Sequence, residues 1–170
     1  RERVSINAEF YSRLFSTTST PAVILDLACG MNPFALPWMN LPPSTQYFAY
    51  DLHQPRVDLI NAFFRHFGQA GCAIHQDILL EPPADPGATV LFFKEAHRFE
   101  QRETGCVRSF LQRLASLQIL LSLPVETLSG SRSMLEQDRR LVARSRAHLQ
   151  HLLVALQRQQ FGHMRHDIGL

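Results

Sequence analysis

Three aspartates close or follow short apolar runs, where a carboxylate could meet a ligand: Asp26, Asp51 and Asp77. Carboxylate oxygens accept hydrogen bonds from hydroxyl and amino groups. A ligand with a ribose, an amine and an exocyclic amino group would use such acceptors. Asp51 could accept from both ribose hydroxyls, and Asp77 from an adenine amino group. The three acids therefore predict a nucleoside-type ligand.

A turn of small residues follows the first apolar run, which covers residues 22–27. It reads Ala28-Cys29-Gly30, and such residues let the backbone turn sharply and approach a ligand closely. The glycine series GxGxxG, which cradles phosphates, is absent from the sequence. This disfavours NAD and ATP and favours S-adenosylmethionine, which carries no phosphate. Taken alone, the turn also suits an ordinary strand–loop junction.

The elements that would position these groups alternate along the chain. Apolar runs predict strands at 22–27, 47–50, 72–74, 89–93 and 118–123. Helical spacing predicts helices at 1–15, 34–39, 56–67 and 99–114, and a long helix at 133–160. This alternation predicts an α/β fold with a doubly wound, mostly parallel sheet. Ligands bind at the carboxyl ends of such strands, so the candidate cofactor-binding residues are Asp26, Ala28, Gly30, Asp51, Asp77 and Lys94.

Composition sets the outer bounds. The 170 residues, of which 45% are hydrophobic and 19% charged, predict one globular domain with a buried core. The net charge of +2 is too small to indicate a nucleic-acid partner by itself. Three widely spaced cysteines predict free thiols and no metal site. The sequence shows neither an apolar run long enough to span a membrane nor a signal peptide, which predicts a cytoplasmic protein.

Five segments, in this order and spacing, resemble one known family: DLACGMNPFALPWM, YFAYDLHQ, QDILLEPP, LFFKEAHRFEQRETG and LLSLPVETLSG. This family is that of the bacterial 16S rRNA (guanine-N7) methyltransferases, which confer aminoglycoside resistance. The resemblance covers nearly the whole chain and includes the approach RERV…FYSRLF to the first strand. It implies a Rossmann-like S-adenosylmethionine-binding domain at 21–170, preceded by a helical lead-in at 1–20.

The resemblance also implies an activity and a partner. The enzyme would methylate one guanine in the decoding region of 16S rRNA, within the assembled small ribosomal subunit. Guanine N7 already presents an in-plane lone pair, so no general base is expected and catalysis would rest on positioning. Cofactor contacts are implied at Gly30, Asp51 and Asp77, with Arg3 a candidate for holding the methionine carboxylate. Arginines near the last helix would contact rRNA phosphates: Arg132, Arg139, Arg140 and Arg144.

Some features depart from the family. Glu126, Ser131 and Asp138 stand where members usually carry an arginine, often another arginine, and commonly a tyrosine. An acid in place of an arginine should weaken rRNA binding. The family's N-terminal docking region and last strands are expected to be missing, which would leave the strand at 118–123 as an unpaired, aggregation-prone edge. A small-molecule methyltransferase and a non-catalytic remnant that binds RNA or cofactor therefore remain alternatives.

Overall fold

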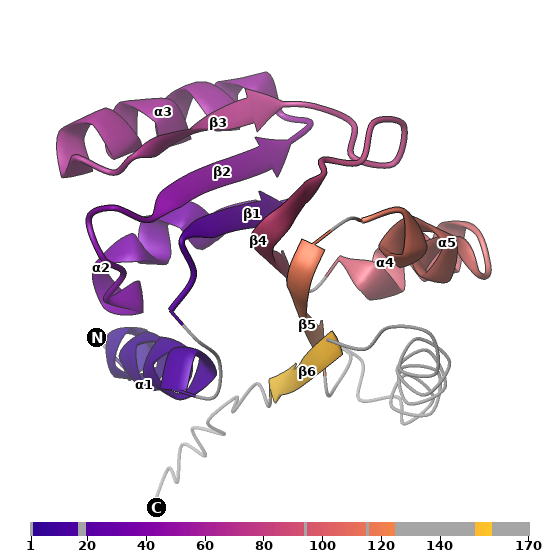
Figure 1. The fold of residues 1–170 in the computed structure, drawn as a ribbon, viewed down its shortest axis with the longest axis horizontal. Helices are drawn as coiled ribbons and strands as arrows, with labels where there is room; N and C mark the ends of the chain where they lie inside the picture. Colours follow the sequence, from indigo (N-terminus) through magenta and orange to yellow (C-terminus); the bar gives the residue numbers. More distant parts are fainter. Residues whose placement is uncertain (1, 17–19, 94, 115, 125–151, 158–170) are drawn as a thin grey trace, which may run out of the picture.

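A parallel sheet lies between two layers of helices in the computed structural model (Figure 1). The structure describes residues 2–16, 20–93, 95–114, 116–124 and 152–157. The strands of this part are β1 (Val23–Leu27), β2 (Gln46–Asp51), β3 (Gly71–His75), β4 (Asp85–Phe93), β5 (Ser116–Pro124) and β6 (Leu152–Gln157). The helices are α1 (Glu2–Ser16), η1 (Asn32–Ala35, a 3-10 helix), α2 (Leu36–Met39), α3 (Gln54–Phe67), α4 (Ala96–Arg102) and α5 (Cys106–Arg113).

The strand order is β3-β2-β1-β4-β5-β6, and every neighbouring pair is parallel. β1 lies between β2 and β4, with Leu25 opposite Phe48 on one side and Val90 on the other. All carboxyl ends therefore meet at one edge of the sheet. This confirms the predicted α/β class and the doubly wound parallel sheet.

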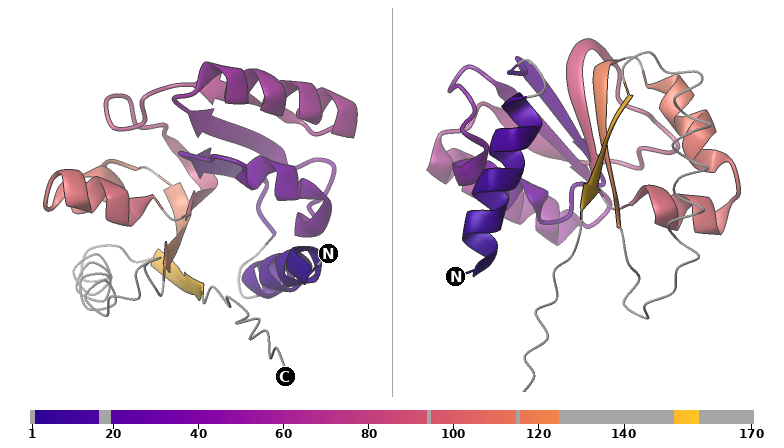
Figure 2. Two further views of the ribbon diagram at one scale, coloured as in Figure 1. Left: turned by 180° about the vertical axis from the view of Figure 1, so that it is seen from behind. Right: turned by 90° about the horizontal axis from the view of Figure 1, so that it is seen from below.

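Alternating side chains of each strand enter two separate cores, one on each face of the sheet. Ile24 packs in one core with α1, α2 and α3, and its neighbour Leu25 packs in the other with α5. Figure 2 shows α1 and the α4–α5 pair on opposite sides of the sheet. Both faces of β1 are covered, which explains why its sequence is a continuous apolar run rather than an alternating one.

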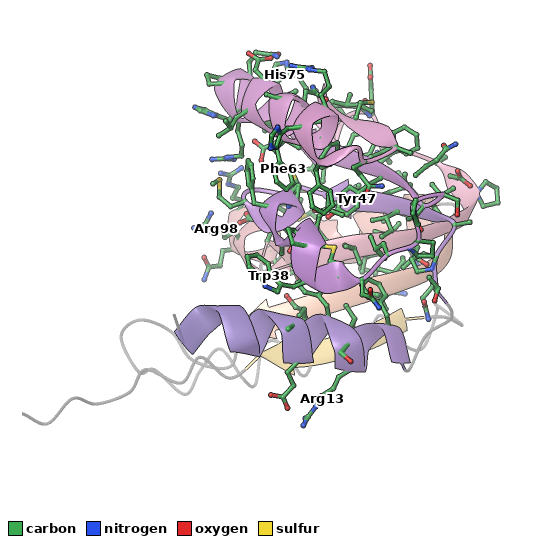
Figure 3. The ribbon with its side chains drawn as sticks, turned by 90° about the vertical axis from the view of Figure 1, so that its left-hand side faces the viewer. Arg13, Trp38, Tyr47, Phe63, His75 and Arg98 are labelled. Carbon is green, nitrogen blue, oxygen red and sulfur yellow. The ribbon has the colours of Figure 1, made fainter. Side chains whose placement is uncertain are left out.

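Aromatic side chains fill much of the core beneath α3. Figure 3 shows Tyr47 and Phe63 between α3 and the sheet, while Arg13 points away from it. The Tyr47 ring, which is fully buried, meets Phe64 edge to face with ring centroids 5.5 Å apart. Trp38 of α2 is only partly buried against the same core. These contacts fix the position of β2, which carries Asp51 at its end.

The prediction of one helix over 99–114 was wrong, because two helices, α4 and α5, occupy this stretch. Glu103 is extended, and Gly105 has a φ of +88°, a left-handed value that glycine adopts without a steric penalty. The Glu100 carboxylate accepts hydrogen bonds from the Gly105 N–H at 2.7 Å and the Val107 N–H at 3.4 Å. This side chain therefore caps α5 from the preceding helix.

The prediction of an unpaired edge at β5 was also wrong. β6 pairs with β5 in parallel, from Ile119 opposite Leu152 to Pro124 opposite Gln157. The sequence had predicted a helix reaching Gln160, because a short apolar run such as 152–156 fits a buried strand and a helix stripe equally well. The rest of that predicted helix, 133–151 and 158–160, lies outside the described residues.

Candidate functional site

The turn after β1 lies against the end of β2. Ala28 and Gly30 both have left-handed backbones, with φ values of +49° and +55°. Between them, the Cys29 N–H donates to the Tyr50 carbonyl oxygen at 2.9 Å. Glycine adopts such φ values without a steric penalty, whereas the Cβ atom of Ala28 makes its backbone conformation strained. The turn thus holds its backbone beside Asp51.

The Asp51 carboxylate is buried and accepts four hydrogen bonds from N–H groups, and a longer one from the Cys29 thiol, whose Sγ lies 3.9 Å from Oδ2. Its Oδ2 accepts from the Gly30 N–H at 3.1 Å, and its Oδ1 from the His53 N–H at 2.8 Å. The Arg56 Nη1 contacts both oxygens, at 2.7 Å to Oδ2 and 2.9 Å to Oδ1. Since a carboxylate has about four acceptor positions, the protein itself fills all of them.

Asp26 lies deeper, at the centre of a polar network between the sheet and α1. Its Oδ2 accepts from the Tyr47 hydroxyl at 2.6 Å and the Asn32 Nδ2 at 3.0 Å, and its Oδ1 is buried with no hydrogen-bond partner among the described residues. The Tyr11 hydroxyl donates to the Asn32 Oδ1, which links α1 to the network. Burial raises the pKa of Asp26 to about 7, although the hydrogen bonds from Tyr47 and Asn32 lower it. Burial likewise raises the pKa of the Cys29 thiol, so this cysteine is held as a neutral thiol.

A cavity of about 330 Å³ opens beside the turn, between α1 and the end of β4. The turn supplies one wall, Phe10 and Tyr11 of α1 supply another, and Phe93 and Glu95 close the β4 side. The Phe10 and Phe93 rings meet edge to face with centroids 5.9 Å apart. The complete lining is Phe10, Tyr11, Ala28, Cys29, Gly30, Met31, Asn32, Ala35, Phe93 and Glu95. The cavity therefore combines aromatic side chains with the small residues of the turn and one carboxylate, that of Glu95.

Asp77 begins a tight turn after β3. Its Oδ1 accepts from the Leu79 N–H at 2.9 Å, and its carbonyl oxygen accepts from the Leu80 and Glu81 N–H groups. The side chain is half-buried at the same edge of the sheet as Asp51. Leu52 and Leu80, which follow the two aspartates, are large apolar side chains with 62% and 78% of their surface exposed.

The structure brings some predicted site residues together and leaves others undescribed. Ala28 and Gly30 line the cavity, Asp51 holds the turn, and Asp26 lies behind Asn32. Direct contact between any of these residues and a cofactor stays a prediction. Lys94 and the predicted RNA-binding residues Arg132, Arg139, Arg140 and Arg144 lie outside the described residues, as does the side chain of Arg3 in α1.

Among the residues of the site that were not predicted are three with polar side chains beside the cavity: Tyr11, Asn32 and Glu95. Tyr11 fits the apolar stripe of its helix. Its hydroxyl could have indicated a place in a polar network, because a buried tyrosine hydroxyl usually has a hydrogen-bond partner. Asn32 stands in a turn before Pro33, where asparagine is common for local reasons. Glu95 follows β4 directly, and its position at the carboxyl end of a strand was a sufficient reason to include it.

No helix among the described residues is long and apolar enough to cross a membrane. Nor do histidine, cysteine, aspartate and glutamate side chains of these residues gather in groups of three that could hold a metal ion.

Known sequences share this arrangement of segments. The chain is 32% identical over 133 residues to a 16S rRNA (guanine(1405)-N(7))-methyltransferase of Micromonospora rosea, an alignment covering 78% of this chain and 48% of the relative. It is 32% identical over 130 residues to the enzyme of the same name in Serratia marcescens, covering 76% and 50%. The chain thus spans about half the length of the curated relatives it matches.

Solved structures share the fold. An rRNA methylase from Escherichia coli superposes with a TM-score of 0.65 at 28% identity, over 83% of this chain and 53% of the other. The 16S rRNA methyltransferase RmtF, solved in complex with S-adenosyl-L-homocysteine, gives 0.66 at 28% identity, over 85% and 55%.

A family model gives the widest match. The model for ribosomal RNA methyltransferase (FmrO) matches residues 1–149, which include α1, the turn after β1 and strands β1 to β5. This agrees with the resemblance that the sequence segments showed. The chain belongs to the FmrO family of ribosomal RNA methyltransferases.

Proposed function

We propose that this chain binds S-adenosylmethionine at the carboxyl edge of its sheet and transfers the methyl group to N7 of a guanine in 16S rRNA. The observation that carries the proposal is the cavity beside the turn after β1, whose residue Gly30 donates its N–H to Asp51. Support comes also from relatives named as 16S rRNA (guanine(1405)-N(7))-methyltransferases and from a similar structure solved with S-adenosyl-L-homocysteine.

The residues present fit this cofactor. A volume of about 330 Å³ lies within the range of small-molecule sites. The lining offers backbone atoms of the turn and the Glu95 carboxylate, which suits an amino-acid end with an ammonium group. Asp51 offers carboxylate oxygens for a ribose, and Asp77 one for an adenine amino group. The exposed Leu52 and Leu80 provide apolar surface for an adenine ring.

The cofactor supplies a methyl group on a positively charged sulfur. The protein's own work is to hold the two reactants in line, and such positioning can remove several kcal/mol from a barrier. Phe10 and Tyr11 of α1 and Phe93 of β4 supply apolar surface on two sides of the cavity. Since guanine N7 carries a lone pair in the plane of its ring, the site needs no general base. The raised pKa values of Tyr11 and Cys29 agree with this, because both groups stay neutral.

The proposed partner is 16S rRNA in the assembled small subunit. Methylation at N7 removes an acceptor and adds a positive charge to the base. A cationic aminoglycoside that contacts this position would then lose a hydrogen bond and meet a like charge, which is how the reaction would give resistance. The predicted phosphate contacts of Arg132, Arg139, Arg140 and Arg144 belong to the same proposal.

The test is transfer of radiolabelled methyl groups from S-adenosylmethionine to isolated small subunits. We expect label in 16S rRNA, strand scission at one guanine by aniline after borohydride reduction, and a rate that falls steeply with salt because arginine–phosphate contacts release counterions. Asp58→Ala, on the exposed side of α3, is the control that should keep the rate. Label in a small metabolite and none in subunits would overturn the rRNA assignment. No label in either, with cofactor bound, would overturn the transfer activity and leave a binding protein.

A further inference from the structure

The acceptor positions of Asp51 pose a conflict for the proposed ribose contact. Besides the longer bond from the Cys29 thiol, Asp51 accepts four hydrogen bonds from N–H groups. Two of these come from the backbone, of Gly30 and His53, which the turn and the start of α3 hold in place. The other two come from a single atom, the Nη1 of Arg56. A ribose has two neighbouring hydroxyl groups, and each needs an acceptor. The two hydroxyls can be accommodated only at the positions that Arg56 now takes.

Arg56 is the partner that can leave. It stands in the first turn of α3, and 34% of its side-chain surface is exposed, against 8% for Asp51. One rotation of its side chain releases one position on Oδ1 and one on Oδ2 together. The released pair matches a vicinal diol in number and in spacing, since the two oxygens belong to one carboxylate.

We propose that Arg56 and the ribose diol of the cofactor compete for the same two acceptor positions of Asp51. Arg56 then determines how strongly the site selects for the diol, because each binding event exchanges a charge-assisted ion pair for two hydroxyl hydrogen bonds. Because the ion pair between Arg56 and Asp51 must break first, the ligand binds more weakly than it would to a site without Arg56. This inference rests on the proposed function, specifically on the use of Asp51 as the ribose acceptor.

The experiment compares two ligands on three proteins by isothermal titration calorimetry. The ligands are S-adenosylhomocysteine and its 2′,3′-dideoxy analogue, which lacks both hydroxyls. The proteins are the 170-residue chain, its Arg56→Met variant, and an Arg65→Met variant as the matched control. Arg65 is exposed in the last turn of the same helix, so its replacement removes the same charge at the other end of α3.

We expect Arg56→Met to bind S-adenosylhomocysteine about tenfold more tightly than the parent chain, the effect of about 1.4 kcal/mol of lost competition. The dideoxy analogue should bind both proteins equally, and Arg65→Met should match the parent with both ligands. The melting temperature of Arg56→Met should fall, because a buried carboxylate loses its ion pair. A purely structural role for Arg56 would give that fall without the gain in affinity.

The outcomes separate this inference from the function on which it rests. Equal or weaker binding of S-adenosylhomocysteine by Arg56→Met, with measurable binding by the parent, overturns the competition and leaves the proposed cofactor in place. The absence of binding by the parent and the variant alike overturns both. If Arg56→Met does not fold, Arg56→Lys carries the test. The ammonium group of lysine lacks the planar fork of the guanidinium group. A higher affinity of Arg56→Lys for S-adenosylhomocysteine but not for the dideoxy analogue supports the competition, whereas an unchanged affinity overturns it.

Discussion

The Tyr47 hydroxyl donates a 2.6 Å hydrogen bond to the Oδ2 of Asp26, from β2 to β1 inside the core. Both residues are almost fully buried, and Asn32 supplies the second donor to the same oxygen. This bond joins the sheet to the polar network that reaches α1 through Tyr11. The network therefore connects one wall of the cavity with the centre of the fold.

Removing the Tyr47 hydroxyl should destabilise the chain. In Tyr47→Phe, the buried carboxyl group keeps only Asn32 as a partner, and the cost of such a loss is about 1–3 kcal/mol of unfolding free energy. Urea denaturation followed by circular dichroism measures it. Tyr50→Phe is the control on the same strand, since no hydrogen bond of its hydroxyl occurs among the described residues. Equal losses in the two variants would contradict a special role for Tyr47.

Stability should depend on pH through Asp26. Burial raises its pKa from an ordinary value of 3.8 to about 7. Between these values, the folded chain holds a proton that the unfolded chain has lost, so raising the pH lowers the free energy of unfolding, by about 1.4 kcal/mol for each unit of displacement. The stabilisation from protonated Asp26 is therefore fully present below pH 3.8 and is lost above about pH 7.

The Asp26→Asn variant isolates this effect, because the amide does not titrate. Between about pH 4 and about pH 7, the free energy of unfolding of the parent chain should fall relative to that of the variant. Above about pH 7, the difference between the two should stay constant. Denaturation curves across that range measure the difference. Parallel pH profiles would show that Asp26 is ionised in the folded chain over the whole range.

Replacing Asp51 should affect binding and folding together. Asp51→Ala removes the proposed ribose acceptor and also the acceptor of the Gly30 and His53 N–H groups. We expect S-adenosylhomocysteine to bind more weakly by about 1–3 kcal/mol, with a lower melting temperature. Asp58→Ala, whose partner is the exposed Gln54, should change neither quantity. Calorimetry with unchanged affinity for Asp51→Ala would remove Asp51 from the site.

A methyl group at Gly71 should be worse tolerated than one at Gly68. Both glycines have positive φ values, +123° and +73°. A Cβ atom at Gly71 would lie 2.0 Å from the Tyr47 carbonyl oxygen, whereas nothing lies within 4 Å of one at Gly68. Gly68→Ala should therefore cost only the backbone strain of about 1–2 kcal/mol, and Gly71→Ala clearly more. Thermal unfolding of both variants ranks them, and equal losses would contradict the close contact between β2 and β3.

Local sequence patterns predicted most of the sheet. β1 and β2 are apolar runs bounded by turn residues, a pattern that favours buried strands, and the aspartate at or next to the carboxyl end of each predicted the place of Asp26 and Asp51. β6 escaped prediction because Leu152–Gln157 reads equally well as a helix stripe. The break between α4 and α5 depends on the Glu100 side chain capping a later turn, which spacing does not show.

The candidate site was predictable in its backbone and not in its side-chain partners. The small residues of the turn indicated a tight curve, and Ala28 and Gly30 adopt it. The pairing of Arg56 with Asp51 depends on how α3 begins relative to β2, a tertiary relation that no local pattern contains. The same holds for Tyr11, whose bond to Asn32 requires α1 to pack on one face of the sheet.

The central place of β1 has a consequence for how the chain folds. β1 pairs on one side with β2, the next strand in the sequence, and on the other side with β4, which comes much later. Ile24 of β1 therefore cannot pair with Thr89 until the chain as far as β4 is available. Contacts between distant positions slow folding, because the intervening chain must be ordered first. During synthesis, which proceeds from the N-terminus, the apolar flank of β1 stays open until β4 has emerged. We expect the nascent chain to need a chaperone most during this interval, which ends when β4 pairs with β1.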